Sequence, residues 1–233
     1  MGLEQAGHEC IGYELDPWKH YLSKFVGSGN CILVDATQID LKEFDAVWAS
    51  PPCQRFSSAR TQGEPTSKYA GDFLNWSLHI EKDILWVENV IPQGKLPTWG
   101  KPFNAAQFLE HPIQNRNRMI GGNYKLPNTY SDYQKTFKDI CPCITATEYK
   151  GSTKDKRRAS RFYGRRLTLE ECAYHQGFII PKEWYNVPKE WLNEINSKTG
   201  RNKTKGQWIY NLYEAIGNGV PVYMAKAFGG MYN

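Results

Sequence analysis

The sequence has 233 residues, 40% of them hydrophobic, and a net charge of +5. A chain of this length and composition can bury one substantial core, so we expect one main domain and not two equal ones. No run approaches the roughly 18 apolar residues of a membrane span, and the start of the chain lacks the features of a secretion signal, so we expect a soluble protein of the cytoplasm.

The first half of the chain alternates short β-rich runs with helical patterns, which is typical of an α/β domain with a largely parallel sheet. In chain order we expect a strand at 9–14, a helix at 17–26, strands at 31–34 and 44–49, a helix at 72–81 and a strand at 84–88. Asp16 and the Gly71-Asp72 pair are expected to begin the helices. Ligands in open α/β sheets bind beyond the carboxyl ends of strands. The polar residues at these ends, which mark a candidate site, are Glu14, Asp35, Ser50 and Glu88.

The second half of the chain is less regular. Residues 121 to 164 show no clear period, so we expect an irregular lobe there. Thr168 can then cap a helix, and Glu171, three residues later, completes a capping box. That helix is expected to run to Gln176 and to stop at Gly177.

A polar insertion follows at residues 181–206, with tryptophan and tyrosine near its start. The last helical region is expected to begin near Gln207, to break at Gly217-Asn218-Gly219 and to resume after Pro221.

Six cysteines are scattered along the chain, which does not resemble the dense framework of a small secreted disulfide domain. We therefore expect reduced thiols at Cys10, Cys31, Cys53, Cys141, Cys143 and Cys172. The Cys141-Pro142-Cys143 pair has no second pair at zinc-finger spacing, so we predict no metal site.

Positive charge is concentrated in one short stretch, in which Asp155 is the only acidic residue. The stretch could neutralise several phosphates, or it could be a solvated loop, and charge alone favours neither. Its basic residues are Lys150, Lys154, Lys156, Arg157, Arg158, Arg161, Arg165 and Arg166.

Cys53 follows an expected buried strand and two prolines, which stiffen the loop and can present the thiol in a fixed direction. A single cysteine of this kind is more often buried and inert. Glu88, at the end of another expected strand, favours a functional role for Cys53. Adjacent strand ends would bring the Glu88 carboxyl group and the Cys53 thiol into one crevice.

Five motifs in order make the sequence resemble the cytosine-C5 DNA methyltransferase family over most of its length. They are Pro52-Cys53-Gln54, Glu88-Asn89-Val90, Gln114-Asn115-Arg116-Asn117-Arg118, the segment from Arg166 to Phe178, and Gly217-Asn218-Gly219-Val220-Pro221. The resemblance implies a Rossmann-like S-adenosylmethionine-dependent methyltransferase fold with a mostly parallel sheet and a small target-recognition lobe. The compact lobe is similar to that of small, phage-carried members.

The resemblance implies a covalent mechanism on a cytosine flipped out of duplex DNA. Cys53 would add to carbon 6 of the ring as a thiolate, which Arg116 or Arg118 would favour. Glu88, carrying a proton, would hydrogen-bond ring nitrogen 3. Carbon 5 would then take the methyl group of S-adenosylmethionine.

The same resemblance assigns binding residues. Those expected to hold the cofactor are Glu14, Asp35, Pro52, Asn218 and Val220. Those expected to contact nucleic acid are Gln54, Ser57, Asn89, Lys156, Arg157, Arg158 and Arg161. We expect a catalytic and cofactor-binding domain at 1–120, a recognition lobe at 121–164 and a C-terminal segment at 165–233 that returns to the catalytic domain.

The sequence also departs from the family. The glycine-loop motif and its strand, which should precede Gly2, are absent. Three explanations compete: a start codon placed too late, a complementing N-terminal segment supplied by a second chain, or a degenerate DNA-binding homologue. A tRNA methyltransferase is a second alternative, but that branch carries Cys-Phe-Thr where this chain has Cys143-Ile144-Thr145. DNA in a prokaryotic or phage-infected cell is therefore the preferred substrate.

Overall fold

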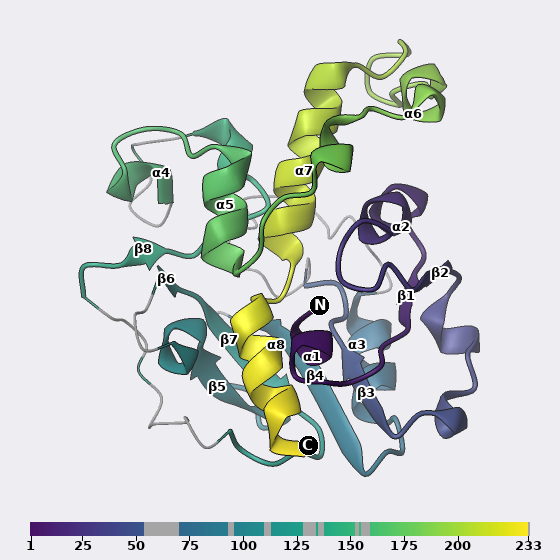
Figure 1. The fold of residues 1–233 in the computed structure, drawn as a ribbon, viewed down its shortest axis with the longest axis vertical. Helices are drawn as coiled ribbons and strands as arrows, with labels where there is room; N and C mark the ends of the chain where they lie inside the picture. Colours follow the sequence, from purple (N-terminus) through teal and green to yellow (C-terminus); the bar gives the residue numbers. More distant parts are fainter. Residues whose placement is uncertain are drawn as a thin grey trace. The chain divides into compact units, whose positions relative to one another are not determined.

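The structure is a computed structural model that describes residues 1–53, 70–92, 96–109, 113–127, 134, 138–151, 154 and 159–232. The chain forms two compact units (Figure 1). The first unit contains residues 1–34 and 141–231, and the second contains residues 35–140 with Tyr232. None of the described helices is long and apolar enough to cross a membrane. The three-part functional division expected from the sequence stays a prediction.

The second unit is built on a four-stranded sheet with the order β3-β4-β7-β5. Its strands are β3 (Ala46–Ala49), β4 (Ile84–Val90), β5 (Gly100–Asn104) and β7 (Asn117–Gly121). β3 and β4 are parallel, and β7 runs antiparallel to both β4 and β5, so three of the four strands share one direction. Only β3 and β4 were expected from the sequence.

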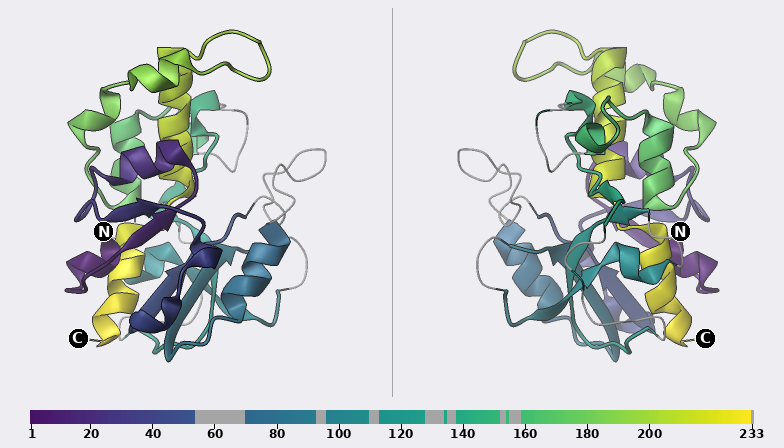
Figure 2. Two further views of the ribbon diagram at one scale, coloured as in Figure 1. Left: turned by 90° about the vertical axis from the view of Figure 1, so that its right-hand side faces the viewer. Right: turned by 90° about the vertical axis from the view of Figure 1, so that its left-hand side faces the viewer.

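Helix α3 (Ala70–Leu78) covers one face of this sheet (Figure 2). Leu74 of α3 packs with Leu85 and Val87 of β4, and all three side chains are buried. Buried and exposed side chains do not alternate along β4, because both faces of the strand are covered, as in the sheets of α/β proteins. The remaining short elements of the unit are η1 (Ala36–Gln38), η2 (Leu41–Glu43), η3 (Ala105–Phe108) and β6 (Gln114–Asn115).

The first unit begins with α1 (Gly2–Gln5) and the parallel pair β1 (Gly12–Glu14) and β2 (Cys31–Leu33). Helix α2 (Pro17–Ser23) connects β1 to β2, and the Asp16 side chain caps it by accepting hydrogen bonds from the amides of Trp18 and Lys19. β1, α2 and β2 therefore form a βαβ unit with parallel strands, as the sequence predicted for this segment.

The rest of the first unit is mainly helical. Its elements are β8 (Cys141–Pro142), η4 (Glu148–Lys150), α4 (Ala159–Phe162), α5 (Leu169–Gln176), η5 (Lys182–Tyr185), α6 (Lys189–Asn193), α7 (Lys205–Asn218), α8 (Val222–Gly229) and the first two residues of η6 (Gly230–Tyr232). The two ends of the chain meet here, because α1 packs beside α8 (Figure 1).

The ends of α5 are those expected from the sequence. Thr168 Oγ1 accepts a hydrogen bond from the Glu171 amide at 3.2 Å, and the Glu171 carboxylate accepts one from the Thr168 amide at 2.8 Å. Gly177 ends the helix in the left-handed conformation with a φ of 85°. The reciprocal cap and the glycine stop are local signals, which explains why the sequence identified them.

The insertion at 181–206 differs from its expected polar character, because two of its tryptophans lie in the core. Trp184 and Trp191 are buried, and the Trp191 ring packs edge-on to Trp18 and Trp208 at 5.3 and 5.1 Å. The indole N–H of Trp184 donates to the Leu22 carbonyl at 2.9 Å. The insertion is therefore a structural element that helps to cover α2 and α7.

Candidate active site

Glu88 and Arg118 form the centre of a polar cluster in the second unit. In the β4–β7 register Glu88 lies opposite Ile120 and Val90 lies opposite Arg118, so Glu88 and Arg118 are diagonal neighbours on one face of the sheet. Glu88 Oε1 lies 2.6 Å from Arg118 Nε, and both side chains are about nine-tenths buried. The sheet register thus holds a carboxylate and a guanidinium together out of water.

The strand that carries Glu88 is longer than expected. The sequence predicted that β4 ends at Glu88, whereas it continues to Val90 because Val90 pairs with Arg118 of β7. Glu88 is therefore fixed within a strand by ladder hydrogen bonds and is not on a free loop.

The loop that carries Cys53 is tied to the same strand. β3 ends at Ala49, opposite Val87 of β4, so the following residues run alongside Glu88. The buried amide side chain of Asn89 donates a hydrogen bond to the Pro51 carbonyl at 3.1 Å. Asn89 therefore positions the loop, and its expected contact with nucleic acid stays a prediction.

The charges of Arg118, Glu88 and Arg116 all act on the Cys53 thiol. Burial raises the pKa of Cys53 above its ordinary value of 9.0, Arg118 and Arg116 lower it, and Glu88 raises it. Burial is the largest of these effects, so the pKa of Cys53 is raised on balance, while Arg118 and Arg116 favour the thiolate as expected from the sequence. The four residues predicted to be catalytic lie in one neighbourhood.

Asn104 is a site residue that sequence reasoning missed. It is fully buried, and its Oδ1 accepts hydrogen bonds from the amides of Ala106 and Arg116, each at 3.1 Å. Its Nδ2 donates to Asn115 Oδ1 at 3.1 Å. The available signal was the capping pattern Asn104-Ala-Ala-Gln107, which the structure shows at η3. Asn104 therefore fixes the backbone from which the Arg116 side chain extends.

The two carboxylates expected to hold a cofactor follow the ends of their strands. Glu14 is the last residue of β1, is half-buried, and its Oε1 accepts a hydrogen bond from the Asp16 amide at 2.9 Å. Asp35 follows β2 and accepts hydrogen bonds from the Thr37 amide and hydroxyl, which lower the pKa of its carboxyl group. Both carboxyl groups also accept hydrogen bonds from the backbone next to them. Asp35 thereby caps the N-terminus of η1.

The last predicted cofactor residues lie at the end of α7 and in the turn that follows it. Asn218 is exposed, and Val220 is half-buried. The buried Gln176 side chain holds this turn, because its Nε2 donates to the carbonyls of Ile216 at 2.6 Å and Gly219 at 3.2 Å. This contact joins the motif segment from Arg166 to Phe178 to the Gly217–Pro221 motif within the first unit. Pro52, in the second unit, is exposed.

Most residues predicted to contact nucleic acid cannot be placed. Arg161 is exposed on α4, and its Nη1 lies 3.4 Å from the Lys154 carbonyl. The others apart from Asn89 lie outside the described residues, namely Gln54, Ser57, Lys156, Arg157 and Arg158.

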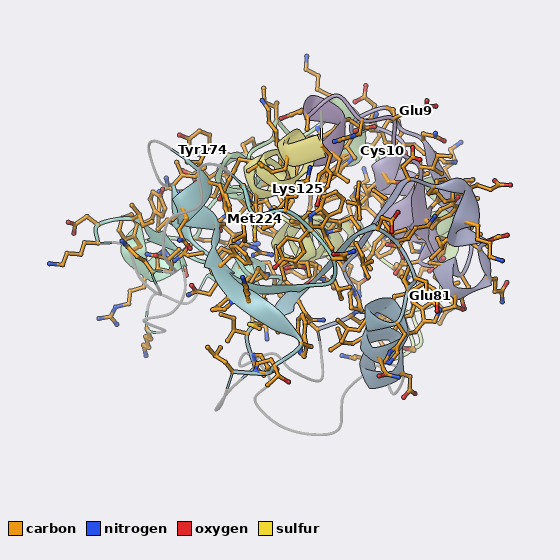
Figure 3. The ribbon with its side chains drawn as sticks, turned by 90° about the horizontal axis from the view of Figure 1, so that it is seen from below. Glu9, Cys10, Glu81, Lys125, Tyr174 and Met224 are labelled. Carbon is orange, nitrogen blue, oxygen red and sulfur yellow. The ribbon has the colours of Figure 1, made fainter. Side chains whose placement is uncertain are left out.

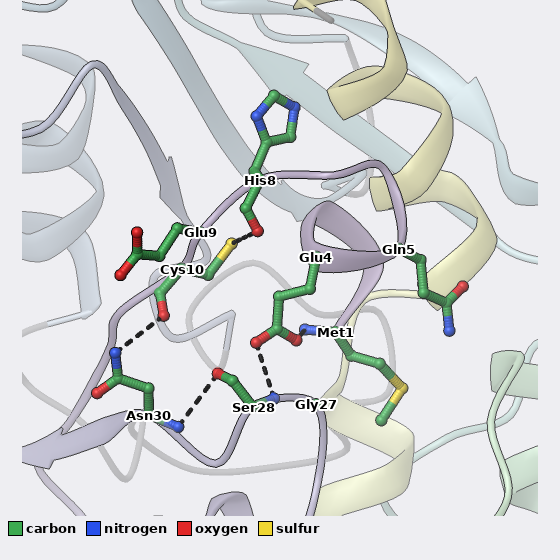
Figure 4. Close-up of a pocket in the computed structure, with 9 residues that line it drawn as sticks. All are labelled: Met1, Glu4, Gln5, His8, Glu9, Cys10, Gly27, Ser28 and Asn30. Carbon is green, nitrogen blue, oxygen red and sulfur yellow. Dashed lines mark hydrogen bonds and ion pairs between the residues drawn. The ribbon is translucent and has the colours of Figure 1, made fainter.

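A separate pocket of about 600 Å³ lies in the first unit around α1 (Figure 4). Glu4 crosses it, bonding to the Met1 amine at 2.7 Å and to the Ser28 amide at 2.9 Å. Its lining contains none of the predicted site residues and consists of Met1, Glu4, Gln5, His8, Glu9, Cys10, Gly27, Ser28 and Asn30. Among the described residues, no group of three or more His, Cys, Asp or Glu side chains could hold a metal ion.

Comparisons with known proteins show similarity at the level of structure. No protein-family model matches the sequence, and no curated protein matches it either. The crystal structure of the Dnmt2 methyltransferase of S. pombe matches with a TM-score of 0.52 and 15% identity over 99% of this chain and 92% of that one. A DNMT2 triple mutant of Spodoptera frugiperda has a TM-score of 0.49 and 13% identity over 97% and 94% of the two chains.

The S. pombe match and the strand pattern together establish the fold class. The sheets are mostly parallel and carry connecting helices, as the sequence predicted. The chain has the α/β, Rossmann-like fold of an S-adenosylmethionine-dependent methyltransferase.

Proposed function

We propose that this protein transfers a methyl group from S-adenosylmethionine to carbon 5 of a cytosine in DNA. The observation that carries the proposal is that Arg118, Glu88 and Arg116 lie near enough to the Cys53 thiol for their charges to act on it, with Glu88 and Arg118 paired at 2.6 Å. A thiol, a carboxyl group and a cation in one buried place are what covalent activation of a pyrimidine ring requires. The similarity to a Dnmt2 methyltransferase supports the fold in which this cluster would act.

Cys53 begins the reaction by forming a bond from Sγ to carbon 6 of the flipped cytosine. The thiol loses its proton on attack, and the positive charges of Arg118 and Arg116 favour the thiolate. As the base displaces Arg118, the Glu88 carboxylate takes up the proton that the Cys53 thiol releases and gives it to ring nitrogen 3, so electrons accumulate at carbon 5 and not on nitrogen. After methylation, carbon 5 loses its hydrogen as a proton, the Cys53 Sγ–carbon 6 bond breaks, and the aromatic ring is restored.

The Glu88–Arg118 pair must open as the base enters. Arg118 Nε occupies one carboxyl oxygen at 2.6 Å, and Arg118 Nη1 donates to the Asn117 carbonyl at 2.7 Å. A base that displaces Arg118 from Glu88 frees the guanidinium to meet the base or its phosphate. Substrate entry would thereby rearrange the charges around Cys53.

S-adenosylmethionine would supply the methyl group on a positively charged sulfur. The donor set fits, because carboxylates after β1 and β2 can accept hydrogen bonds from ribose hydroxyls and from an adenine amino group. Within the proposal the residues that hold the cofactor are Glu14, Asp35, Pro52, Asn218 and Val220. A complementing N-terminal segment or second chain remains a proposed partner.

Transfer of tritium-labelled methyl groups to duplex DNA and to tRNA tests this function. We expect label in 5-methylcytosine of DNA, and label in tRNA alone would replace DNA by tRNA as the substrate. Absence of transfer to either, with no heat on titration of S-adenosylmethionine into the folded protein, would leave a nucleic-acid-binding homologue without catalysis and would overturn the enzymatic proposal.

A further inference from the structure

Four aromatic rings form a continuous row on α4 and α5 in the first unit. Phe162 and Tyr163 have ring centroids 5.3 Å apart, Tyr163 and His175 are 5.8 Å apart, and His175 and Tyr174 are 5.6 Å apart. We call these four residues the ring row. Each contact is edge to face, so flat faces of the rings are left for other partners.

Three rings of the row are exposed to an extent that a folded core does not explain. The exposed fractions are 49% for Phe162, 39% for Tyr163 and 63% for Tyr174. Figure 3 labels Tyr174, whose side chain lies at the surface. Phe162 and Tyr163 are exposed rings in contact with each other, and the buried His175 connects Tyr163 to the exposed Tyr174. Single exposed aromatic side chains are common, but a group of them can mark an interaction site. The ring row is therefore a candidate binding surface.

The row is held in place before any partner binds. The Tyr163 hydroxyl and His175 Nε2 lie 2.8 Å apart in a hydrogen bond. The Arg165 guanidinium lies over the Tyr163 ring at 5.9 Å and is itself bound to Glu171 at 2.9 Å. Because Glu171 belongs to the cap of α5, the orientation of Tyr163 is coupled to a rigid helix end, which lowers the entropic cost of binding.

Positive charge borders the row. Arg161 and Arg166 are exposed, and among the described residues neither forms an ion pair with a carboxylate. Arg161 directly precedes Phe162 in the chain, and Arg165 lies over the Tyr163 ring, whereas the Arg166 guanidinium lies over the Tyr213 ring of α7 at 5.1 Å, outside the row. Exposed guanidinium groups beside exposed aromatic rings match a partner that carries both phosphates and flat bases.

We propose that the ring row binds unpaired bases of a nucleic acid strand, with Phe162 and Tyr174 as stacking platforms and Arg161 as a phosphate contact. Bases inside a duplex are stacked on each other and present only their edges, so they cannot use exposed ring faces. The inference rests on the proposed function in that both require a nucleic acid substrate, and it deepens that function by specifying a substrate with a single-stranded, looped or opened segment.

Fluorescence anisotropy with labelled oligonucleotides of equal length tests the ring row. The probes are a single strand, a hairpin with an unpaired loop and a fully paired duplex, without S-adenosylmethionine. We expect Tyr174→Ala to weaken binding of the single strand and the loop about tenfold and to leave duplex binding unchanged. Tyr174→Phe, which keeps the ring face, is expected to bind like the original protein.

A control substitution and a charge substitution separate stacking from other effects. Ile195→Ala removes another exposed apolar side chain of the first unit, 59% exposed, and is expected to change nothing. Arg161→Gln is expected to weaken all three probes and to reduce the salt dependence of binding. Equal affinity of Tyr174→Ala and the original protein for unpaired probes would overturn the proposal, as would an equal loss for the duplex.

The binding assay is independent of methyl transfer. Cys53→Ser is expected to show the same probe preference as the original protein, because the ring row contains no reacting group. If no methyl transfer is detected but Tyr174→Ala still weakens binding of the unpaired probes, the proposed function is overturned and the binding role of the ring row is kept. If methyl transfer occurs and Tyr174→Ala binds unpaired probes normally, the ring row is overturned alone.

Discussion

Burial and charges of opposite sign act together on the pKa of the Cys53 thiol. Burial, the largest effect, raises this pKa above its ordinary value. The nearby charges oppose each other, because Arg118 favours the thiolate and Glu88 disfavours it. A base that binds Glu88 would remove part of the opposing charge when attack is required.

Substitution of Arg118 is expected to raise the pKa of Cys53 further. Arg118→Gln removes the positive charge that lowers this pKa and leaves Glu88 to raise it. The measurement is the rate of Cys53 alkylation by iodoacetamide as a function of pH, followed by peptide mass spectrometry. Arg161→Gln, in the other unit, serves as the control, and an unchanged or lowered pKa in Arg118→Gln would show that Arg118 does not act on the thiol.

Substitution of Glu88 is expected to have the opposite effect on the same pKa. Glu88→Gln removes a negative charge, so the pKa of Cys53 falls and alkylation accelerates at pH 8. Methyl transfer is nevertheless expected to slow by about 100-fold, since the amide cannot give a proton to the ring. Slower alkylation in Glu88→Gln, in a sample shown to be folded by circular dichroism, would contradict this account.

Close backbone contact at Gly217 fixes the C-terminal part of α7 within the first unit. A Cβ atom at Gly217 would lie 2.3 Å from the amide of Ala146 and from the carbonyl carbon of Thr145. A Cβ at Gly219 would lie 3.4 Å from its nearest atom, the Ile216 carbonyl oxygen, which leaves it more room. The first glycine of the Gly217-Asn218-Gly219 motif is thus required by packing.

Gly217→Ala is expected to lower the free energy of unfolding by about 1–3 kcal/mol, because the backbone of residues 145 and 146 must move. Gly219→Ala is the matched control and is expected to change stability much less. Chemical denaturation followed by tryptophan fluorescence measures both, and equal stability of the two variants would show that the contact at Gly217 is relaxed in solution.

The Glu171 side chain in the cap of α5 is expected to make a pH-dependent contribution to the free energy of unfolding. Hydrogen bonds from Arg165 hold the pKa of Glu171 at about 2, below its ordinary 4.5. A depressed carboxyl pKa stabilises the fold above the unfolded pKa, and this stabilisation is lost as the pH falls from 4.5 toward 2. Glu171→Gln keeps a capping side chain but removes the charge, so it isolates this effect.

At pH 7 we expect Glu171→Gln to lose about 0.5 kcal/mol of unfolding free energy, since the pair with Arg165 is largely exposed. The difference from the original protein is expected to vanish as the pH approaches 2. Urea denaturation at several pH values checks this, and a difference independent of pH would mean that the charge of Glu171 does not contribute.

Across the molecule, the sequence predicted those features that depend on local signals. The ends of α5, the cap at Asp16 and strands β3 and β4 are each specified by a few neighbouring residues. The family resemblance named Cys53, Glu88, Arg116 and Arg118, and the structure brings these residues together.

The features that the sequence did not predict depend on contacts between distant residues. β4 extends past Glu88 because Arg118, thirty residues later in the chain, supplies a partner for Val90. Asn104 accepts a hydrogen bond from the Arg116 amide, and the local capping pattern at Asn104 does not predict this distant contact. Trp191 is buried because Trp18 packs against it from the other end of the sequence. Propensity and periodicity do not contain this information.

Covalent trapping measures the central claim most directly. A DNA oligonucleotide with 5-fluorocytosine carries fluorine where the normal substrate loses a proton, so the final elimination is blocked. With S-adenosylmethionine we predict a covalent protein–DNA adduct in denaturing mass spectrometry, located at Cys53 and absent from Cys53→Ser. An adduct of equal yield in Cys53→Ser, or methyl transfer by that variant, would contradict the assignment of Cys53 as the nucleophile.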